Sequence, residues 1–177
     1  PLPYQQIIHD RFSVEIARGC TRGCRFCQAG MIYRPVRERS AERIYALLEE
    51  GLSRSGYGEA TLLSLSSGDY SCLNLLLPTL MERWEREKVA FSLPSLRVDT
   101  LGPEVIEQIR RVRKTGFTIA PEAGTQRLRD VINKNITEED ILQTARTAFA
   151  LDWRVLKLYF MIGLPPERQE DLDGRVG

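Results

Sequence analysis

The sequence predicts an α/β fold in which a parallel sheet with outer helices forms a partial (β/α)6 TIM-like barrel. Short, nearly continuous apolar segments alternate with longer segments whose apolar residues recur every three or four positions. Unbroken apolar strands are typical of parallel sheets that are covered on both faces. Because crossovers between parallel strands are almost always right-handed, successive units of this kind curl into part of a barrel.

Five strands are expected along the chain. The first, residues 12–18 (FSVEIAR), leads into a loop rich in cysteine, and the second is residues 60–67. The others are residues 89–94, 116–122 and 154–165. Since only five strands are visible, we expect the barrel to be truncated after strand five. The sheet edge exposed there would favour self-association.

Helices are expected between the strands, each with one apolar face. The residues of the first three faces are Ile44, Leu47, Leu48 and Leu52 behind the cap Ser40; Leu73, Leu76, Leu77, Leu80, Met81 and Trp84; and Val105, Ile106, Ile109 and Val112. Pro78 lies inside the second face, so a kink or a restarted helix is expected there. Further helices are expected near residues 125–133, after Thr137, and from residue 167.

Length and composition indicate an ordinary globular protein. The 177 residues fit one domain, 42% of them are apolar, 28% are charged, and the net charge is +1. This balance does not favour nucleic acid or a membrane surface as a partner. There is no apolar run of the roughly 20 residues that a membrane span needs and no signal peptide, so we expect a cytoplasmic protein. The chain starts at Pro1 and stops in mid-pattern, and we interpret residues 1–177 as one domain excised from a longer protein.

Three cysteines within eight positions are the most unusual feature of the sequence. Cys20, Cys24 and Cys27 have the spacing C-x3-C-x2-C, and only Cys72 lies elsewhere. Structural zinc would need a fourth ligand, either His9 or Cys72, and zinc sites favour paired C-x2-C units. A redox disulfide between Cys20 and Cys27 lacks a thioredoxin-like context. We therefore favour a [4Fe–4S] cluster with three thiolate ligands and one open iron.

The spacing, the aromatic Phe26 before the last cysteine and the position after the first strand resemble the radical S-adenosylmethionine (SAM) superfamily. The resemblance implies that the open iron is chelated by the methionyl group of SAM. It also implies reductive cleavage of SAM to a 5′-deoxyadenosyl radical, which takes hydrogen from a substrate that the sequence does not identify. A one-electron donor such as flavodoxin or ferredoxin is then an expected partner. A non-catalytic, zinc- or iron–sulfur-stabilised binding module is the alternative.

The resemblance also assigns cofactor contacts at the strand ends. Ser67, Gly68 and Asp69 stand where the superfamily has a Gly-Gly-Glu-like turn that holds the methionyl amino group. A simple turn before a helix cap at Ser71 is the alternative. Glu122, in a segment similar to a G-x-E-S-G variant, is expected to accept hydrogen bonds from the ribose or to meet the methionyl end.

Further contacts are expected from later strands and from the cysteine loop. A cation inside a buried strand is costly unless it is paired, so Lys157 is expected to face a carboxylate inside the barrel, either that of the cofactor or Glu122. The resemblance implies adenine contacts from the residues Phe26, Gln28, Met161 and Gly163, with plain core packing as the alternative for the last two. Arg97 is expected to bind cofactor or substrate, or to pair with Asp99.

The surrounding segments resemble the cobalamin-associated and the methylthiotransferase or elongator-like branches, and most of all an uncharacterised fused radical SAM family. Cobalamin, or a second cluster, would then be bound by domains outside this chain. Basic residues at 34–43 and 110–114 are interpreted as solvated helix faces, because Glu38 and Glu42 interrupt the first group and the second closes a helix. An RNA substrate is therefore not favoured. Cys72 is expected to be a buried, small apolar residue.

Overall fold

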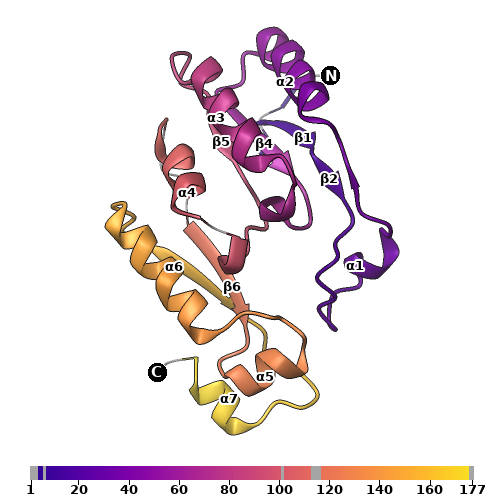
Figure 1. The fold of residues 1–177 in the computed structure, drawn as a ribbon, viewed down its shortest axis with the longest axis vertical. Helices are drawn as coiled ribbons and strands as arrows, with labels where there is room; N and C mark the ends of the chain where they lie inside the picture. Colours follow the sequence, from indigo (N-terminus) through magenta and orange to yellow (C-terminus); the bar gives the residue numbers. More distant parts are fainter. Residues whose placement is uncertain (1–3, 6, 101, 113–116, 176–177) are drawn as a thin grey trace.

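The computed structural model describes residues 4–5, 7–100, 102–112 and 117–175. Strands and helices alternate along the chain (Figure 1). The strands are β1 (Phe12–Glu15), β2 (Ala17–Arg18), β3 (Arg37–Glu38), β4 (Glu59–Leu63), β5 (Ala90–Ser92), β6 (Phe117–Glu122) and β7 (Leu156–Phe160). The helices are α1 (Ala29–Ile32), α2 (Ala41–Ser55), α3 (Leu73–Trp84), α4 (Pro103–Arg110), α5 (Gln126–Val131), α6 (Glu138–Ala150) and α7 (Gln169–Asp173), with single 3-10 turns η1 (Ser67–Asp69) and η2 (Val98–Thr100).

The α/β class and the parallel strands are confirmed, but the strands form two parallel sheets instead of one. One sheet has the order β1-β4-β5, and the other pairs β6 with β7. β2 and β3 form a small antiparallel pair. Figure 1 shows α2 and α3 beside the first sheet, α6 along the second, and α5 and α7 beyond the end of β6. The two sheets and their helices are the consecutive parts of a partial barrel.

Several strand bounds differ from the expectation. The first strand is divided at Ile16. The Ile16 N–H donates to Leu63 and its carbonyl oxygen accepts from Arg39, so the backbone at this residue bonds to two different segments of the chain. The last strand ends at Phe160 instead of residue 165, because Gly163 with φ +88° and the two prolines after it leave the extended conformation. Residue 116, the expected start of the fourth strand, lies outside the described residues.

The expectation that the last strand is buried is wrong. Leu158 is 44% exposed and Tyr159 is 49% exposed, while the paired strand β6 contributes the buried residues Phe117 and Ile119. Among the described residues, β7 pairs with β6 alone and forms the edge of its sheet. An apolar run in the sequence predicted a strand here correctly, but it did not predict how much of that strand is covered.

The helices follow the expected apolar faces. The Ser40 hydroxyl accepts from the Arg43 N–H at the start of α2, as predicted. α3 runs from Leu73 to Trp84 through Pro78, so the predicted restart is wrong. α3 is stabilised by tertiary packing that outweighs the hydrogen bond lost at Pro78. Cys72 is the N-cap residue of α3 and is partly exposed, in contrast to the expected buried position.

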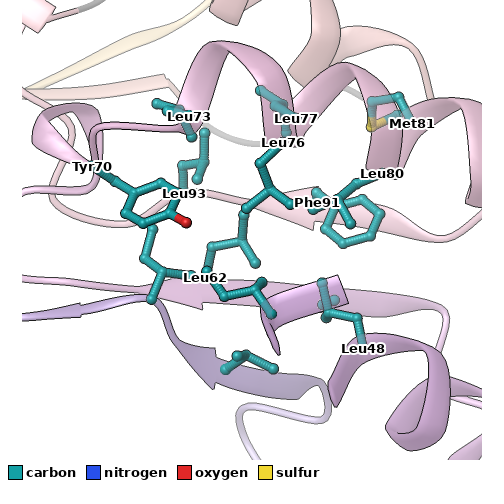
Figure 2. Close-up of a cluster of buried hydrophobic side chains, with 14 of the residues drawn as sticks. Leu48, Leu62, Tyr70, Leu73, Leu76, Leu77, Leu80, Met81, Phe91 and Leu93 are labelled. Atoms are coloured by element: carbon teal, nitrogen blue, oxygen red, sulfur yellow. The ribbon is translucent and has the colours of Figure 1, made fainter. Parts of the chain in front are cut away.

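The largest core lies between the first sheet and its helices. Leucines of α3 interdigitate with Leu62, Phe91 and Leu93 of the first sheet region, and Leu48 of α2 closes the other side (Figure 2). The second sheet has two smaller clusters, one around Phe117 and one around Leu128. None of the described helices is long and apolar enough to cross a membrane.

Candidate functional site

The three clustered cysteines lie on the loop of residues 19–28, between β2 and α1. Cys20, Cys24 and Cys27 are free thiols and partly exposed. A hydrogen bond of 3.0 Å from the Cys27 N–H to the Cys24 carbonyl oxygen bends the loop. In the part of the chain that the structure describes, no three His, Cys, Asp or Glu side chains are grouped so that they could share one metal ion. The fold therefore gathers the thiols on one segment without arranging them as a ligand set.

The loop begins in a backbone conformation that requires glycine. Gly19 has φ +91°, and a Cβ atom there would lie 2.6 Å from the carbonyl oxygen of Tyr33. The chain that returns from α1 thus packs directly on the start of the loop. A cavity of about 210 Å³ adjoins Cys20 and is lined by Gly19, Cys20, Ser64, Ser66, Asp69 and Tyr70, among others. Cys20 and Asp69, both predicted site residues, therefore face the same cavity.

An ionic network connects the cysteine loop to the ends of β4 and β5. The Arg22 guanidinium donates to both carboxylate oxygens of Asp69 and, at 2.9 Å, to Asp99. The Arg22 hydrogen bond holds the pKa of Asp69 below its usual range, and the same bond raises the pKa of Arg22. Since η1 and η2 follow neighbouring strands of one sheet, a single arginine ties the loop to two strand ends.

Arg97 joins the same network and approaches a cysteine. Its Nε is 2.9 Å from Asp99, so the pairing left open by the sequence is present. Its other nitrogens lie 2.7 Å from the Lys134 carbonyl oxygen and 4.0 Å from the Cys24 sulfur. Because only 9% of its side chain is exposed, Arg97 places a fixed positive charge beside the loop.

In the predicted turn after β4, Ser67 and Gly68 pack against neighbouring residues, whereas Asp69 faces the cysteine loop. Ser67 is fully buried, and its hydroxyl donates to Pro94 at 2.6 Å. A Cβ atom at Gly68 would lie 2.0 Å from the Thr100 hydroxyl, so the position requires glycine. Only Asp69 directs a functional group toward the loop. The alternative cap at Ser71 is wrong, because the Ser71 hydroxyl and N–H both donate to Glu38 instead.

Glu122 ends β6 with φ +69° and pairs with a lysine that the sequence analysis did not single out. The Lys134 Nζ lies 3.1 Å from Glu122, and the two side chains are 11% and 17% exposed. The expectation that Lys157 faces Glu122 inside the barrel is wrong. Lys157 is exposed on β7, and its Nζ lies 5.2 Å from the centroid of the Tyr159 ring. A cofactor contact by Lys157 stays a prediction.

The predicted adenine contacts come from two segments, the cysteine loop and the end of β7. Phe26 is 38% exposed, with the Lys134 Nζ 5.9 Å from its ring centroid. Gln28 is exposed and precedes α1 without capping it. Met161 packs on the small cluster around Leu128, which is the plain core packing left open by the sequence. The Gly163 N–H donates to Glu167 at 2.7 Å. The structure therefore groups Phe26 with Lys134 and Glu122, and the end of β7 lies beside Glu122, because the Met161 N–H donates to the Glu122 carbonyl oxygen at 2.8 Å.

The donors of the loop fit an iron–sulfur cluster in kind and in number. Three free thiols on one exposed loop are the ligand type that such clusters require. The Arg22 N–H lies 3.4 Å from the Cys20 sulfur, and Arg97 lies near that of Cys24. Hydrogen bonds of this kind to ligand sulfur atoms tune the potential of a bound cluster.

Sequence reasoning missed Arg22, Asn133 and Lys134. Arg22 was visible between two cysteines, but nothing local indicated its partners 47 and 77 residues away. The segment Asn-Lys-Asn at 133–135 carried a weaker signal. Asparagine tolerates the left-handed conformation, and both asparagines adopt it, with φ +55° and +49°.

Comparisons with known proteins place the chain in a family. A family model described as the radical SAM superfamily matches residues 14–175. The chain is 40% identical over 162 residues to an uncharacterised protein of Methanocaldococcus jannaschii, covering 92% of this chain and 35% of that protein. It is 23% identical over 173 residues to the ribosomal protein uS12 methylthiotransferase RimO of a Thermoanaerobacter species, covering 90% of this chain and 38% of that protein. The chain thus spans little more than a third of the curated relatives it matches.

Solved structures share the fold at low sequence identity. The radical SAM methyltransferase TsrM from Kitasatospora setae, solved with cobalamin and a [4Fe–4S] cluster, has a TM-score of 0.75 at 13% identity, covering 92% of this chain and 33% of that chain. The cobalamin-dependent radical SAM enzyme OxsB, solved with aqua-cobalamin and SAM, has a TM-score of 0.68 at 18% identity, covering 93% and 25%. The fold and family expected from the sequence are confirmed.

Members of this superfamily are enzymes that use a [4Fe–4S] cluster and SAM and that generally need an electron donor. The expectation of an enzyme with these cofactors is confirmed at the level of the family. The non-catalytic module loses its support, because the match extends over nearly the whole chain instead of the cysteine loop alone. From the cysteine loop, the strand ends and this match, the chain belongs to the radical SAM superfamily.

Proposed function

We propose that residues 1–177 are the core domain of a radical SAM enzyme in which Cys20, Cys24 and Cys27 hold one [4Fe–4S] cluster. The observation that carries the proposal is the position of the three free thiols at the carboxyl end of β1 and β2, tied by Arg22 to the ends of β4 and β5. Active sites of barrels of parallel strands lie at that end. The bound group would supply one-electron reductive cleavage of SAM, and so a radical for hydrogen abstraction from the substrate.

The protein's own part in this function is to hold charge around the loop. Arg22 and Arg97 bring positive charge to the loop: the Arg22 N–H lies 3.4 Å from the Cys20 sulfur, and the Arg97 guanidinium lies 4.0 Å from the Cys24 sulfur. Asp69 and Asp99 balance that charge and keep both arginines oriented. We infer that Asp69 binds the methionyl amino group while it keeps its contact with Arg22, since a carboxylate can accept several hydrogen bonds.

A second group of residues is suited to the nucleoside end of SAM. Glu122 presents acceptor oxygens that Lys134 holds in place, and Phe26 offers a partly exposed ring beside them. We infer that Glu122 binds ribose hydroxyls and that Phe26 and Gln28 meet the adenine. Met161 and Gly163 complete this side through the end of β7. Arg97, within reach of both groups, orients the loop between them.

Two more specific reactions each need a test of their own, because the named relatives differ in chemistry. The similarity to RimO over 90% of the chain favours methylthio transfer, and the fold shared with TsrM and OxsB favours a cobalamin-dependent reaction. Either would draw on domains beyond this segment. Cobalamin and iron content of a longer protein distinguish them, since only the second function predicts bound cobalamin. Flavodoxin or ferredoxin is the proposed electron donor for both.

The first experiment is anaerobic reconstitution with iron and sulfide, followed by EPR of the reduced protein with and without SAM. We expect a [4Fe–4S]+ signal that shifts when SAM is added. Cys24→Ala should abolish the signal, whereas the control Cys72→Ala should retain it, because Cys72 lies outside the loop at the start of α3. A colourless protein that binds zinc through the same cysteines would refute the proposal.

A further inference from the structure

The cysteine loop is held by a turn from the other sheet. Residues 131–135, which we call the 131–135 turn, begin at the last residue of α5 and belong to the half of the molecule built on β6 and β7. The loop itself leaves the half built on β1, β4 and β5. The two segments are separated by more than a hundred residues in the sequence, so their contact is purely tertiary.

Backbone groups account for the first part of this contact. The Arg25 N–H donates to the Ile132 carbonyl oxygen at 2.9 Å, and the Arg25 guanidinium donates to the Val131 carbonyl oxygen. These carbonyl groups belong to the last turn of α5 and the residue after it, where helical carbonyl groups lack partners within the helix. The loop therefore satisfies part of the end of α5.

The side chain of Asn133 makes the second part of the contact between the loop and the 131–135 turn. Its Nδ2 lies 2.8 Å from the Gly23 carbonyl oxygen and 3.5 Å from that of Arg22. Both partners are carbonyl oxygens, which can only accept, so only the NH₂ group of the amide can face them. Because Gly23 precedes Cys24 directly, this bond fixes the backbone at the central cysteine of the motif.

The same turn is contacted from the end of β5. Arg97 donates to the Lys134 carbonyl oxygen at 2.7 Å and approaches the Cys24 sulfur from there. Asn133 and Arg97 thus fix, respectively, the backbone before Cys24 and a cation near its sulfur, and both do so through neighbouring residues of one turn.

We propose that Asn133 is a positioning residue that holds residues 22–25 of the cysteine loop on the 131–135 turn and so sets the place of Cys24 relative to Arg97. This role rests on the proposed function only in that Cys24 is a cluster ligand. It assigns a task to a residue far from the motif in sequence. It also makes the geometry of the loop depend on the packing of both halves of the molecule.

The test compares Asn133→Gly with the matched control Asn135→Gly. Both asparagines are left-handed, so glycine retains the backbone conformation at either site. Of these two asparagines, Asn133 is the one whose side chain donates to the loop in the described part of the chain. Hydrogen–deuterium exchange of the metal-free chain reports on the Arg25 amide, whose acceptor is Ile132. We expect exchange there to be roughly two- to tenfold faster in Asn133→Gly alone, the size of one lost net hydrogen bond.

A second readout separates positioning from general stability. After anaerobic reconstitution, the g-values of the reduced cluster, and their shift with SAM, should change in Asn133→Gly and match the wild type in Asn135→Gly. Equal exchange at Arg25 in both variants, or an unchanged EPR spectrum in Asn133→Gly, would overturn the proposal. If the wild type forms no cluster, the proposed function fails, while the exchange comparison still decides whether Asn133 holds the loop.

Discussion

The two halves of the molecule stabilise their strand ends in different ways. Around β1, β4 and β5, one continuous apolar cluster reaches from α2 through the sheet to α3 (Figure 2). Around β6 and β7, the apolar residues divide into two small clusters, and β7 is half exposed. Polar contacts such as Glu122–Lys134 hold the strand end there. The first half is therefore a rigid support for the cysteine loop, and the second half positions the loop mainly through charge and hydrogen bonds.

The largest expected effect is the loss of core packing in the first half. Leu80 is fully buried in α3, whereas Leu158 of β7 is 44% exposed. Leu80→Ala should lower the free energy of unfolding by about 2–5 kcal/mol, and Leu158→Ala by less than about 0.5 kcal/mol. Urea unfolding followed by circular dichroism measures both. Similar costs would mean that the two halves are equally well packed.

The next effect concerns the two lysines of the second half. Lys134→Met removes the partner of the mostly buried Glu122 and should cost about 1–3 kcal/mol of unfolding free energy. Lys157→Met removes an exposed cation over Tyr159 and should cost less than about 1 kcal/mol. Denaturant unfolding of both variants is the measurement. A larger loss in Lys157→Met would restore the sequence-based expectation of a buried Lys157.

A smaller effect should come from the ionic link between the loop and the strand ends. Arg22→Gln removes the cation shared by Asp69 and Asp99, and we expect a loss of about 1 kcal/mol, reduced at high salt because the groups are partly exposed. Arg54→Gln, which breaks an exposed pair with Glu50 in α2, is the control and should be neutral. Thermal unfolding of both variants at low and high salt is the measurement. Equal melting midpoints of Arg22→Gln and Arg54→Gln would argue against a structural link through Arg22.

The smallest effect is a pH-dependent one at the start of α6. The N–H and hydroxyl of Thr137 donate to Asp140 at 2.7 Å and hold the pKa of Asp140 below its usual range. A lowered pKa in the folded state means that the stabilisation is present above the ordinary pKa of an aspartate and is lost as pH falls through the folded value. Asp140→Asn should lower the melting midpoint by about 1–3 °C near neutral pH and converge with the wild type in acid. If the difference in melting midpoint between the variant and the wild type stays the same at all pH values, the role assigned to the Asp140 carboxylate is contradicted.

Most of the fold could be predicted from the sequence, because the signals for helix caps and apolar faces act between residues that are close together in the chain. Ser40 and Thr137 cap the helices that they were expected to cap, since a cap acts within three residues. Lys157 was misjudged because an apolar run does not reveal whether another element covers it. Arg22, Asn133 and Lys134 were missed because their partners lie on other strands and turns.

By itself the sequence determined the α/β class, the order of the strands, the cysteine loop and the family to which they belong, since apolar periodicity and the spacing C-x3-C-x2-C are properties of consecutive residues. Only the tertiary structure decided which charges meet. It paired Asp69 with Arg22 and Glu122 with Lys134, and it laid the loop on the 131–135 turn. Such pairings depend on how two sheets and their connecting loops pack, and a buried charge takes the partner that the packing brings within reach.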